Sequence, residues 1–218
     1  MSAKNIVITG STKGIGRGMA EQFMGHGHNV IISSRKQADC ERVAAELSAA
    51  HPESKAAGFA CQVRDHEQVQ ALWNGAVEAL GSIDIWINNA GVSNRHGLFK
   101  DLSAEEFVRV VDTNLIGSMN CCKVAINGML AQDKRGQVYN FEGFGSDGRT
   151  GFGMSVYGST KRSLVYLTEA LAEEVDGSNV QVTAISPGMV ITDMILEQAS
   201  YRSGDDWEMA KAMYNCLG

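Results

Sequence analysis

Tyr157 and Lys161 are the residues of this sequence whose types and spacing most directly suggest chemistry. An i, i+4 spacing places both side chains on one face of a helix. A nearby ammonium favours the phenolate and lowers a phenol pKa that is normally about 10. A tyrosine with such a neighbour can exchange a proton with a carbonyl or an alcohol near neutral pH. The pair therefore predicts acid–base catalysis, although a bare Tyr/Lys pair on a helix surface usually has no function.

A glycine cluster follows the first apolar run, in ITGSTKGIG at positions 8–16. Gly10, Gly14 and Gly16 would form a tight turn that lets the backbone approach a phosphate, and the following helix N-terminus would supply unpaired N–H groups. The spacing G-x-x-x-G-x-G differs from the usual dinucleotide fingerprint, so an ordinary turn is the alternative. Because a predicted strand precedes the cluster and a predicted helix follows it, we favour a dinucleotide site.

The residues after the second predicted strand indicate which dinucleotide binds. In such folds an acidic residue at this point holds the ribose hydroxyls of NAD. Here Ser34, Arg35 and Lys36 stand in its place, and Lys13 lies inside the glycine cluster. Arg35 and Lys13 could clamp a 2′-phosphate, for which a guanidinium is well suited, or both could be solvated surface cations. We expect NADP(H) as the cofactor.

Apolar β-rich runs alternate with amphipathic segments, and these elements must position the residues above. The expected strands cover 5–9, 29–33, 56–63, 83–88, 137–141 and 179–186, and the expected helices cover 15–25, 37–50, 66–80, 104–131 and 156–174. This alternation predicts an α/β fold with one doubly wound, Rossmann-like parallel sheet and helices on both faces. With no repeat or linker in the sequence, we expect residues 1–218 to form a single domain. No strand is expected after the sixth, so either the sheet has only six strands or, as we expect, the last strand of the sheet is missing from the chain.

The composition narrows the partners and the compartment. A formal net charge of −6 argues against nucleic acid or an anionic membrane surface as the main partner. No segment is long and apolar enough to span a bilayer, and no basic and apolar leader opens the sequence. The five cysteines form no CxxC or Cys/His cluster, which predicts no metal site and favours a reducing compartment. We therefore expect a cytoplasmic protein that acts on a small molecule.

Five motifs resemble those of the short-chain dehydrogenase/reductase family and occur in the order found in that family. They are TGSTKGIG at 9–16, NNAG at 88–91, VDTN at 111–114, YGSTK at 157–161 and SPGMVITD at 186–193. The resemblance covers nearly the whole chain. It implies an NAD(P)-binding Rossmann fold and hydride transfer between a carbonyl and an alcohol.

The resemblance also implies roles for individual positions. Tyr157 would be the acid/base, Lys161 its activator, and Asn114 would interrupt its long helix and hold a water in a proton relay. The cofactor would carry the hydride while the protein orients and polarises the substrate. With the residues argued above, the expected cofactor site comprises Gly10, Ser11, Thr12, Lys13, Gly14, Ile15, Gly16, Ser34, Arg35, Val63, Asn89, Ala90, Gly91, Tyr157, Lys161, Pro187, Gly188, Val190 and Thr192.

One departure from the family pattern lies after the fifth predicted strand. Family members usually carry a serine there that hydrogen-bonds the substrate carbonyl and stabilises the developing oxyanion. In this sequence positions 140–143 read NFEG, and the loop up to Tyr157 carries one extra residue. Ser146 is the next hydroxyl, and we expect the lengthened loop to bring it into the vacant place.

Glu142 is the alternative to Ser146. It follows a parallel strand directly and would face the usual ligand crevice. If buried it could be protonated and donate to the substrate, because desolvation raises a carboxyl pKa. An ion pair with Arg149 or Lys161, or a purely structural hydrogen bond, would explain it equally well, and we favour a structural role.

The run NFEGFGSDG followed by VYGSTKRSL also resembles chlorophyll b reductases, the plant enzymes that reduce a ring formyl group, and their bacterial homologues. This resemblance implies an aldehyde on a bulky, flat, apolar substrate. Apolar residues of the nearby loops would suit such a ligand, or would pack beneath a lid; they are Phe144, Phe152, Met154, Met189 and Met194.

The sequence thus predicts an NADPH-dependent carbonyl reductase, with a chlorophyll b-like formyl group as one substrate. One alternative is an alcohol dehydrogenase that works in the oxidative direction. Another is a catalytically silent dinucleotide sensor that signals through a partner, which the missing serine favours and the Tyr157–Lys161 pair opposes. The family resemblance further implies a homodimer or homotetramer formed through the helices that carry Asn114 and Tyr157.

Overall fold

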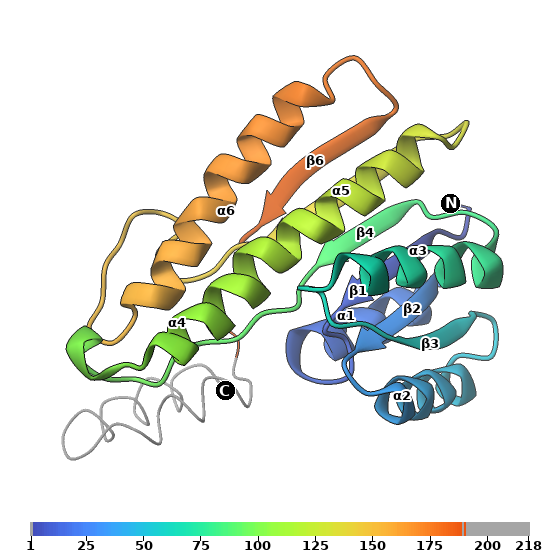
Figure 1. The fold of residues 1–218 in the computed structure, drawn as a ribbon. Coiled ribbons are helices and arrows are strands. Elements are labelled where there is room, and N and C mark those ends of the chain that lie inside the picture. The colour runs from blue at the N-terminus through green and yellow to red at the C-terminus, as the bar shows by residue number, and fades with distance from the viewer. Residues whose placement is uncertain (1, 189, 191–218) are drawn as a thin grey trace.

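The computed structural model describes residues 2–188 and Val190. Within them, six parallel strands form one sheet in the order β3-β2-β1-β4-β5-β6 (Figure 1). The strands are β1 (Asn5–Thr9), β2 (Asn29–Ser34), β3 (Ala56–Ala60), β4 (Ile85–Asn88), β5 (Gly136–Phe141) and β6 (Val180–Ile185). The α-helices are α1 (Gly14–Gly25), α2 (Gln37–Ala50), α3 (His66–Leu80), α4 (Ala104–Val111), α5 (Gly117–Leu130) and α6 (Ser155–Glu174).

Both faces of the sheet are apolar because successive side chains of a strand point to opposite sides. Val7 and Trp86 pack with α3, α5 and the end of α6 on one face. Ile8 and Ile32 pack with α1 and α2 on the other. The doubly wound parallel sheet predicted from the sequence is confirmed. The expected absence of a last strand concerns a part of the chain outside the described residues.

The strand order reverses between β1 and β4, which lie side by side although β2 and β3 intervene in the sequence. In doubly wound sheets ligands bind in the crevice at the carboxyl ends of the strands at this switch point. The glycine cluster follows β1 and the NNAG motif follows β4, so the fold brings both motifs to that crevice.

The segment predicted as one helix over 104–131 is divided in the structure. A π-helical segment, Asp112–Ile116, separates α4 from α5. Short π segments inside α-helices add one residue per turn and occur frequently at functional sites. Asn114 lies in the middle of this segment, as the family resemblance implies for the residue that interrupts the helix.

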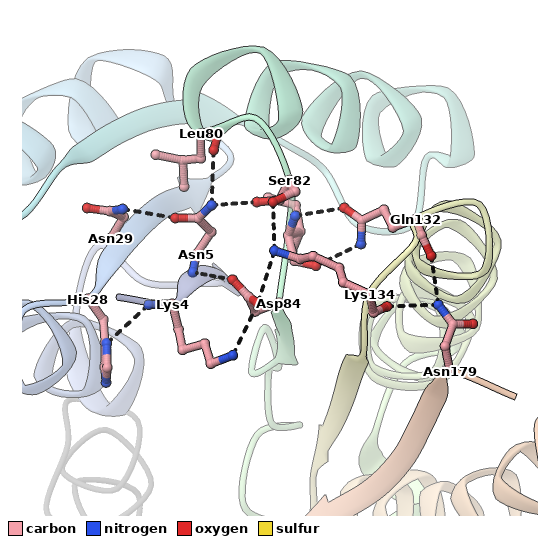
Figure 2. A network of polar contacts seen from close by, with 11 residues as sticks. Lys4, Asn5, His28, Asn29, Leu80, Ser82, Asp84, Gln132, Lys134 and Asn179 are labelled. Atoms are coloured by element: carbon pink, nitrogen blue, oxygen red, sulfur yellow. Dashed lines mark hydrogen bonds and ion pairs between the residues drawn. The ribbon is translucent and has the colours of Figure 1, made fainter. Parts of the chain in front are cut away.

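The amino edge of the sheet, opposite the crevice, is joined by a polar network (Figure 2). Asp84, which precedes β4, accepts a hydrogen bond from the backbone N–H of Asn5 at 2.9 Å. Its carboxylate also pairs with Lys134 at 3.0 Å and Lys4 at 3.4 Å. Burial alone would raise the pKa of Asp84, but the Asn5 N–H and the two ammonium groups together hold that pKa below its usual value.

Asn179 forms a second part of the same network. Its side-chain Nδ2 donates to the carbonyl oxygens of Met129, Gln132 and Lys134 at 2.8 to 2.9 Å. Figure 2 shows the bonds to Gln132 and Lys134. The amide therefore ties the start of β6 to the loop between α5 and β5. This edge is held by side chains, whereas the opposite edge carries the loops of the candidate site.

No helix among residues 2–188 is both long enough and apolar enough to cross a bilayer.

Candidate active site

Lys161 is anchored to the end of β5. It is buried in α6, and its Nζ donates to the backbone carbonyl oxygen of Phe141 at 2.8 Å. The same Nζ lies 5.7 Å from the centre of the Tyr157 ring, one helical turn earlier. The structure thus places the two side chains on one face of α6, as their spacing predicts.

Burial sets the ionisation of this pair. Desolvation raises the pKa of Tyr157 to about 12. Desolvation also lowers the pKa of Lys161 to about 8, against the opposing effect of the Glu142 carboxylate. The expected lowering of the phenol pKa is therefore wrong for this structure, because burial removes the phenolate from water and raises that pKa instead. Tyr157 is protonated at neutral pH and Lys161 is close to half charged at pH 8.

The hydroxyl of Tyr157 lies against the backbone of Gly143. A Cβ added to Gly143 would lie 2.5 Å from that hydroxyl oxygen and 3.3 Å from Cε of Lys161. Sequence reasoning treated Gly143 only as one of the positions without serine. The sequence signal that could have identified Gly143 was its place in the chain. A glycine stands there, where the family has a side chain next to the tyrosine.

Ser146 lies in the turn that follows Gly143. Its backbone N–H donates to the carbonyl oxygen of Gly143 at 3.0 Å, and its own carbonyl oxygen accepts from Nη1 of Arg162 at 2.7 Å. Gly145 packs on Gly158, because a Cβ added at Gly145 would lie only 2.8 Å from the Cα of Gly158. The turn is thus fixed along the Gly158 and Arg162 side of α6, and Ser146 is buried in it.

Glu142 follows β5 directly and is bonded to the end of β6. Its backbone N–H donates to the Ile185 carbonyl oxygen at 2.9 Å. It lines a cavity of about 290 Å³ between α6 and β6 together with Thr168 and Glu169. Arg149, one of its two expected partners, pairs with Asp147 instead, and none of the ion pairs among the described residues includes Glu142.

Asn114 is locked by three hydrogen bonds of its side chain. Oδ1 accepts from the N–H of Val92 at 2.8 Å, and Nδ2 donates to the Val92 carbonyl oxygen at 2.9 Å and to Oγ1 of Thr160 at 3.1 Å. A Cβ at Gly91 would lie 3.4 Å from Oδ1 of Asn114 and 3.8 Å from Nζ of Lys161. The NNAG loop, the π-helical segment and α6 therefore meet at Gly91.

The NNAG loop also holds the glycine cluster. Asn89 donates to the carbonyl oxygens of Thr9 and Gly10 at 2.9 and 3.0 Å. A Cβ at Gly16 would lie 2.6 Å from the Asn89 amide nitrogen, and a Cβ at Gly10, whose φ is +66°, would lie 2.9 Å from Cα of Ala90. These contacts bring the two motifs together and require glycine at both positions.

Other expected cofactor residues have structural contacts. Ser11 is buried, and its Oγ donates to the Ile8 carbonyl oxygen and accepts from the Ser33 N–H. Val63 packs on Gly117, where a Cβ would lie 2.6 Å from its Cγ2. Ser11 therefore ties β1 to β2, and Val63 fixes the start of α5.

The start of α1 fits an anionic ligand. No side chain caps this helix, whose N-cap residue is Lys13, and its first turn contains no acidic residue. Unpaired N–H groups and the positive end of the helix dipole favour a phosphate at such a position. Lys13 and Gly14 are exposed, Thr12 is half-buried, and Arg35 is exposed after the half-buried Ser34 at the end of β2. The residues present therefore fit a dinucleotide, whose phosphates the glycine cluster and the start of α1 would hold.

Ile15 and Val190, both expected to contact the cofactor, line the same cavity of about 450 Å³. Pro187 and Gly188 follow β6 directly, at the carboxyl edge of the sheet. Thr192, Met189 and Met194 lie outside the described residues. In the described part of the chain, no group of three or more His, Cys, Asp or Glu residues could hold a metal ion.

Aromatic residues gather on the loop that leads to Tyr157. Phe144 and Phe152 are exposed, and the Phe152 ring centre lies 5.2 Å from that of His96. A Cβ at Gly151 would lie 2.9 Å from the Phe144 ring and 3.8 Å from Cγ of Met154. We call residues 144–154 the substrate loop; its apolar side chains lie between Gly143 and the first turn of α6.

Comparison with known proteins places this geometry in a family. The family model described as short chain dehydrogenase matches residues 4–202. The chain is 42% identical to chlorophyll(ide) b reductase NOL, chloroplastic, of Oryza sativa subsp. japonica, covering 98% of this chain and 62% of the relative. It is 31% identical to carbonyl reductase family member 4 of Danio rerio, covering 95% and 88%.

The solved structures agree with this assignment. A short chain dehydrogenase/reductase from Burkholderia phymatum in complex with NAD has a TM-score of 0.83 and 26% identity, covering 97% of this chain and 78% of that one. A 3-ketoacyl-(acyl-carrier-protein) reductase from Brucella melitensis complexed with NADH has a TM-score of 0.81 and 27% identity, covering 97% and 89%.

Two facts follow about length and location. The chain spans 62% and 60% of the length of the NOL reductases from Oryza sativa and Arabidopsis thaliana. The cytoplasmic location expected from the sequence is contradicted, because four plant relatives at 35 to 42% identity are all named as chloroplastic. That expectation was drawn from the composition and the first residues, and neither property separates these compartments.

The fold, the glycine cluster, the Tyr157–Lys161 pair and the match over residues 4–202 lead to one assignment. The chain belongs to the short-chain dehydrogenase family.

Proposed function

We propose that the protein is an NADPH-dependent reductase that acts on an aldehyde group of a bulky, flat, apolar substrate. The observation that carries the proposal is the meeting of Asn114 and Lys161 at Gly91, with Tyr157 one helical turn away. This arrangement sets an acid–base group beside the NNAG loop, which is part of the expected cofactor site. The names of the chlorophyll(ide) b reductases support a formyl group as the reducible carbonyl.

The proposed roles follow from the ionisation of the site. When bound, the dinucleotide supplies the hydride that reduces the carbonyl carbon. Tyr157 donates a proton to the carbonyl oxygen, and a pKa of about 12 keeps it in the protonated form that reduction requires. Lys161, held by the Phe141 carbonyl oxygen, orients the tyrosine and returns the proton through the relay in which Asn114 holds a water.

The cofactor proposal rests on family and charge. Two of the related structures are complexes with NAD and with NADH, which supports a nicotinamide dinucleotide. Two exposed cations, Lys13 and Arg35, flank the expected position of the adenosine ribose where an NAD-binding fold would have a carboxylate. A 2′-phosphate would pair with them, which favours NADP(H).

Ser146 remains the proposed replacement for the family serine. The bond from its N–H to the Gly143 carbonyl oxygen keeps it within one turn of the residue that contacts the Tyr157 hydroxyl. The exposed rings of Phe144 and Phe152 would contact the flat face of the substrate.

A direct test follows NADPH absorbance with benzaldehyde and with pyrene-1-carboxaldehyde, a large planar aldehyde. The wild-type chain should oxidise NADPH with at least one of them, and Tyr157→Phe should remove that activity while leaving NADPH binding intact. An equal rate in Tyr157→Phe would contradict the assigned role of the tyrosine.

A second candidate is a catalytically silent dinucleotide sensor, which the glycine at position 143 favours. Tight NADPH binding in calorimetry, together with no NADPH oxidation by any aldehyde or ketone, would support the sensor and reject the reductase.

We also propose that the chain forms a homodimer or homotetramer through α4, α5 and α6. Apolar side chains are exposed on these elements, among them Val108 at 55%, Met119 at 40% and Tyr166 at 77%. Sedimentation of the full chain tests this proposal, and a monomer at micromolar concentration would contradict it.

A further inference from the structure

Asn94 joins the substrate loop to the backbone of the acid–base tyrosine. It lies three residues after the NNAG motif and is 1% exposed. Its Oδ1 accepts from the backbone N–H of Tyr157 at 3.1 Å. Its Nδ2 donates to the carbonyl oxygen of Gly153 and to that of Arg95, each at 2.9 Å. One amide thus accepts a bond from the N–H of Tyr157 in α6, donates one to the substrate loop and donates one within its own loop.

The acceptor bond replaces a missing helix cap. The first N–H groups of a helix have no partner within the helix and are normally satisfied by the side chain of the N-cap residue. Met154 is the N-cap residue of α6 and makes no such bond. The first bond inside the helix runs from Gly158 to the Met154 carbonyl oxygen, so the N–H of Tyr157 depends on Asn94.

The donor bond fixes the part of the substrate loop that carries the aromatic rings. Gly153 has a φ of +74°, and a Cβ there would lie 2.7 Å from the ring of His96. Phe152 adjoins Gly153, and its ring lies beside the same histidine. The position of Phe152 therefore depends on the bond between Asn94 and the Gly153 carbonyl oxygen.

We propose that Asn94 is a positioning residue with two separable effects on the reaction. Its acceptor oxygen holds Tyr157 in place for proton transfer to any aldehyde. Its donor nitrogen holds the substrate loop in place for binding of a large planar aldehyde. The predicted changes in kcat and KM rest on the proposed function, whereas the predicted changes in loop and helix order do not.

Two variants separate the two bonds at pH 7. Asn94→Asp keeps an oxygen acceptor for the Tyr157 N–H but faces the Gly153 and Arg95 carbonyl oxygens with a carboxylate. It should raise KM for pyrene-1-carboxaldehyde about tenfold, the effect of roughly one hydrogen bond, and change kcat for benzaldehyde less than about twofold. Asn94→Ala loses the acceptor bond as well as both donor bonds and should also lower kcat about tenfold for both aldehydes.

Asn179→Asp is the matched control. This half-buried amide also donates to backbone carbonyl oxygens, but at the opposite edge of the sheet (Figure 2). It should lower the Tm while leaving the ratio of the two KM values unchanged. A merely structural role for Asn94 predicts that Asn94→Asp behaves in the same way, and that result would overturn the proposal.

Hydrogen exchange measured by mass spectrometry tests the proposal without activity. Asn94→Asp should speed exchange in residues 144–154 alone, whereas Asn94→Ala should speed it there and at 155–158. Unchanged exchange at 155–158 in Asn94→Ala would contradict the inference. A wild-type chain that reduces no aldehyde would reject the proposed function, and the exchange data would still decide the role of Asn94.

Discussion

The Tyr157 hydroxyl occupies the space that a side chain at Gly143 would need: a Cβ at position 143 would lie 2.5 Å from the hydroxyl oxygen. The atom that would have to move is the far end of the tyrosine side chain, which is the group assigned to proton transfer. A change at Gly143 should therefore affect catalysis more than folding.

Gly143→Ala should lower kcat about 100-fold, since misplacing a catalytic group by about 1 Å has an effect of this size. Gly143→Ser, which restores the residue type usual in the family, should be equally inactive because its Cβ meets the same oxygen. Steady-state kinetics and thermal unfolding measure both effects. Wild-type turnover in Gly143→Ser would show that the position tolerates the family serine.

Lys161→Met should abolish turnover and stabilise the fold at pH 7. Burial lowers the folded pKa of Lys161 from 10.5 to about 8, so the unfolded chain binds more protons between those values and wild-type stability rises with pH in that window. The variant should be more stable at pH 7 by up to about 3 kcal/mol, at about 1.4 kcal/mol per pKa unit. Urea unfolding at pH 7 and pH 10 measures the difference, which should shrink at the higher pH. A difference that is constant with pH would count against this account.

Ser146→Ala should lower kcat strongly and Glu142→Gln only mildly at pH 7. The pH profile gives Glu142 a further signature. If turnover requires the Lys161 ammonium, it should fall above about pH 8. Because the Glu142 carboxylate raises the pKa of Lys161, Glu142→Gln should move that fall to lower pH. A larger kcat loss in Glu142→Gln than in Ser146→Ala would reverse the two assignments.

Arg35→Asp should exchange the preference between the two dinucleotides. It removes a guanidinium available to a 2′-phosphate and introduces the carboxylate that would hold ribose hydroxyls. The ratio of kcat/KM for NADPH to that for NADH should fall by about 100-fold or more. Arg42→Ala, an exposed cation of α2 paired with Glu46, is the control and should leave the ratio unchanged. An unaltered ratio in Arg35→Asp would place the 2′-phosphate elsewhere.

Asp84→Asn should destabilise the fold by about 1–3 kcal/mol at pH 7, since it leaves two ammonium groups without their carboxylate. The folded pKa of Asp84 lies below its unfolded value. Its contribution to stability is therefore complete above the unfolded pKa and is lost as the pH falls through the folded pKa. Denaturant unfolding should show the wild type and the variant converging below about pH 4, where the unfolded carboxyl is protonated. Turnover should be unaffected, because Asp84 lies at the amino edge of the sheet.

The sequence predicted the sheet well because each strand is a short apolar run and each helix is amphipathic. The helices α2 and α3 begin and end at the predicted residues. The π-helical segment was not visible as a local pattern, since its extra residue is stabilised by bonds from Asn114 to Val92 and Thr160. Those partners lie 22 and 46 residues away in the sequence.

Only those residues of the candidate site were predicted whose side chains themselves suggest a chemical role. Tyr157 and Lys161 are noticed as a proton-transferring pair at helical spacing. Gly143 and Asn94 are not, because a glycine acts through the space it leaves and a buried amide acts through distant carbonyl oxygens. The ionisation of Tyr157 was predicted with the wrong sign because burial cannot be read from spacing.

The lysine at the centre of the site is held by a backbone oxygen, that of Phe141. Every amino acid supplies the same carbonyl, so no single substitution at position 141 deletes the acceptor of Lys161. The side chain at that position is therefore free to change with the packing of α1 and α2 while the anchor of the lysine stays the same. Position 141 can therefore change its side chain in the core and still hold the lysine through its backbone.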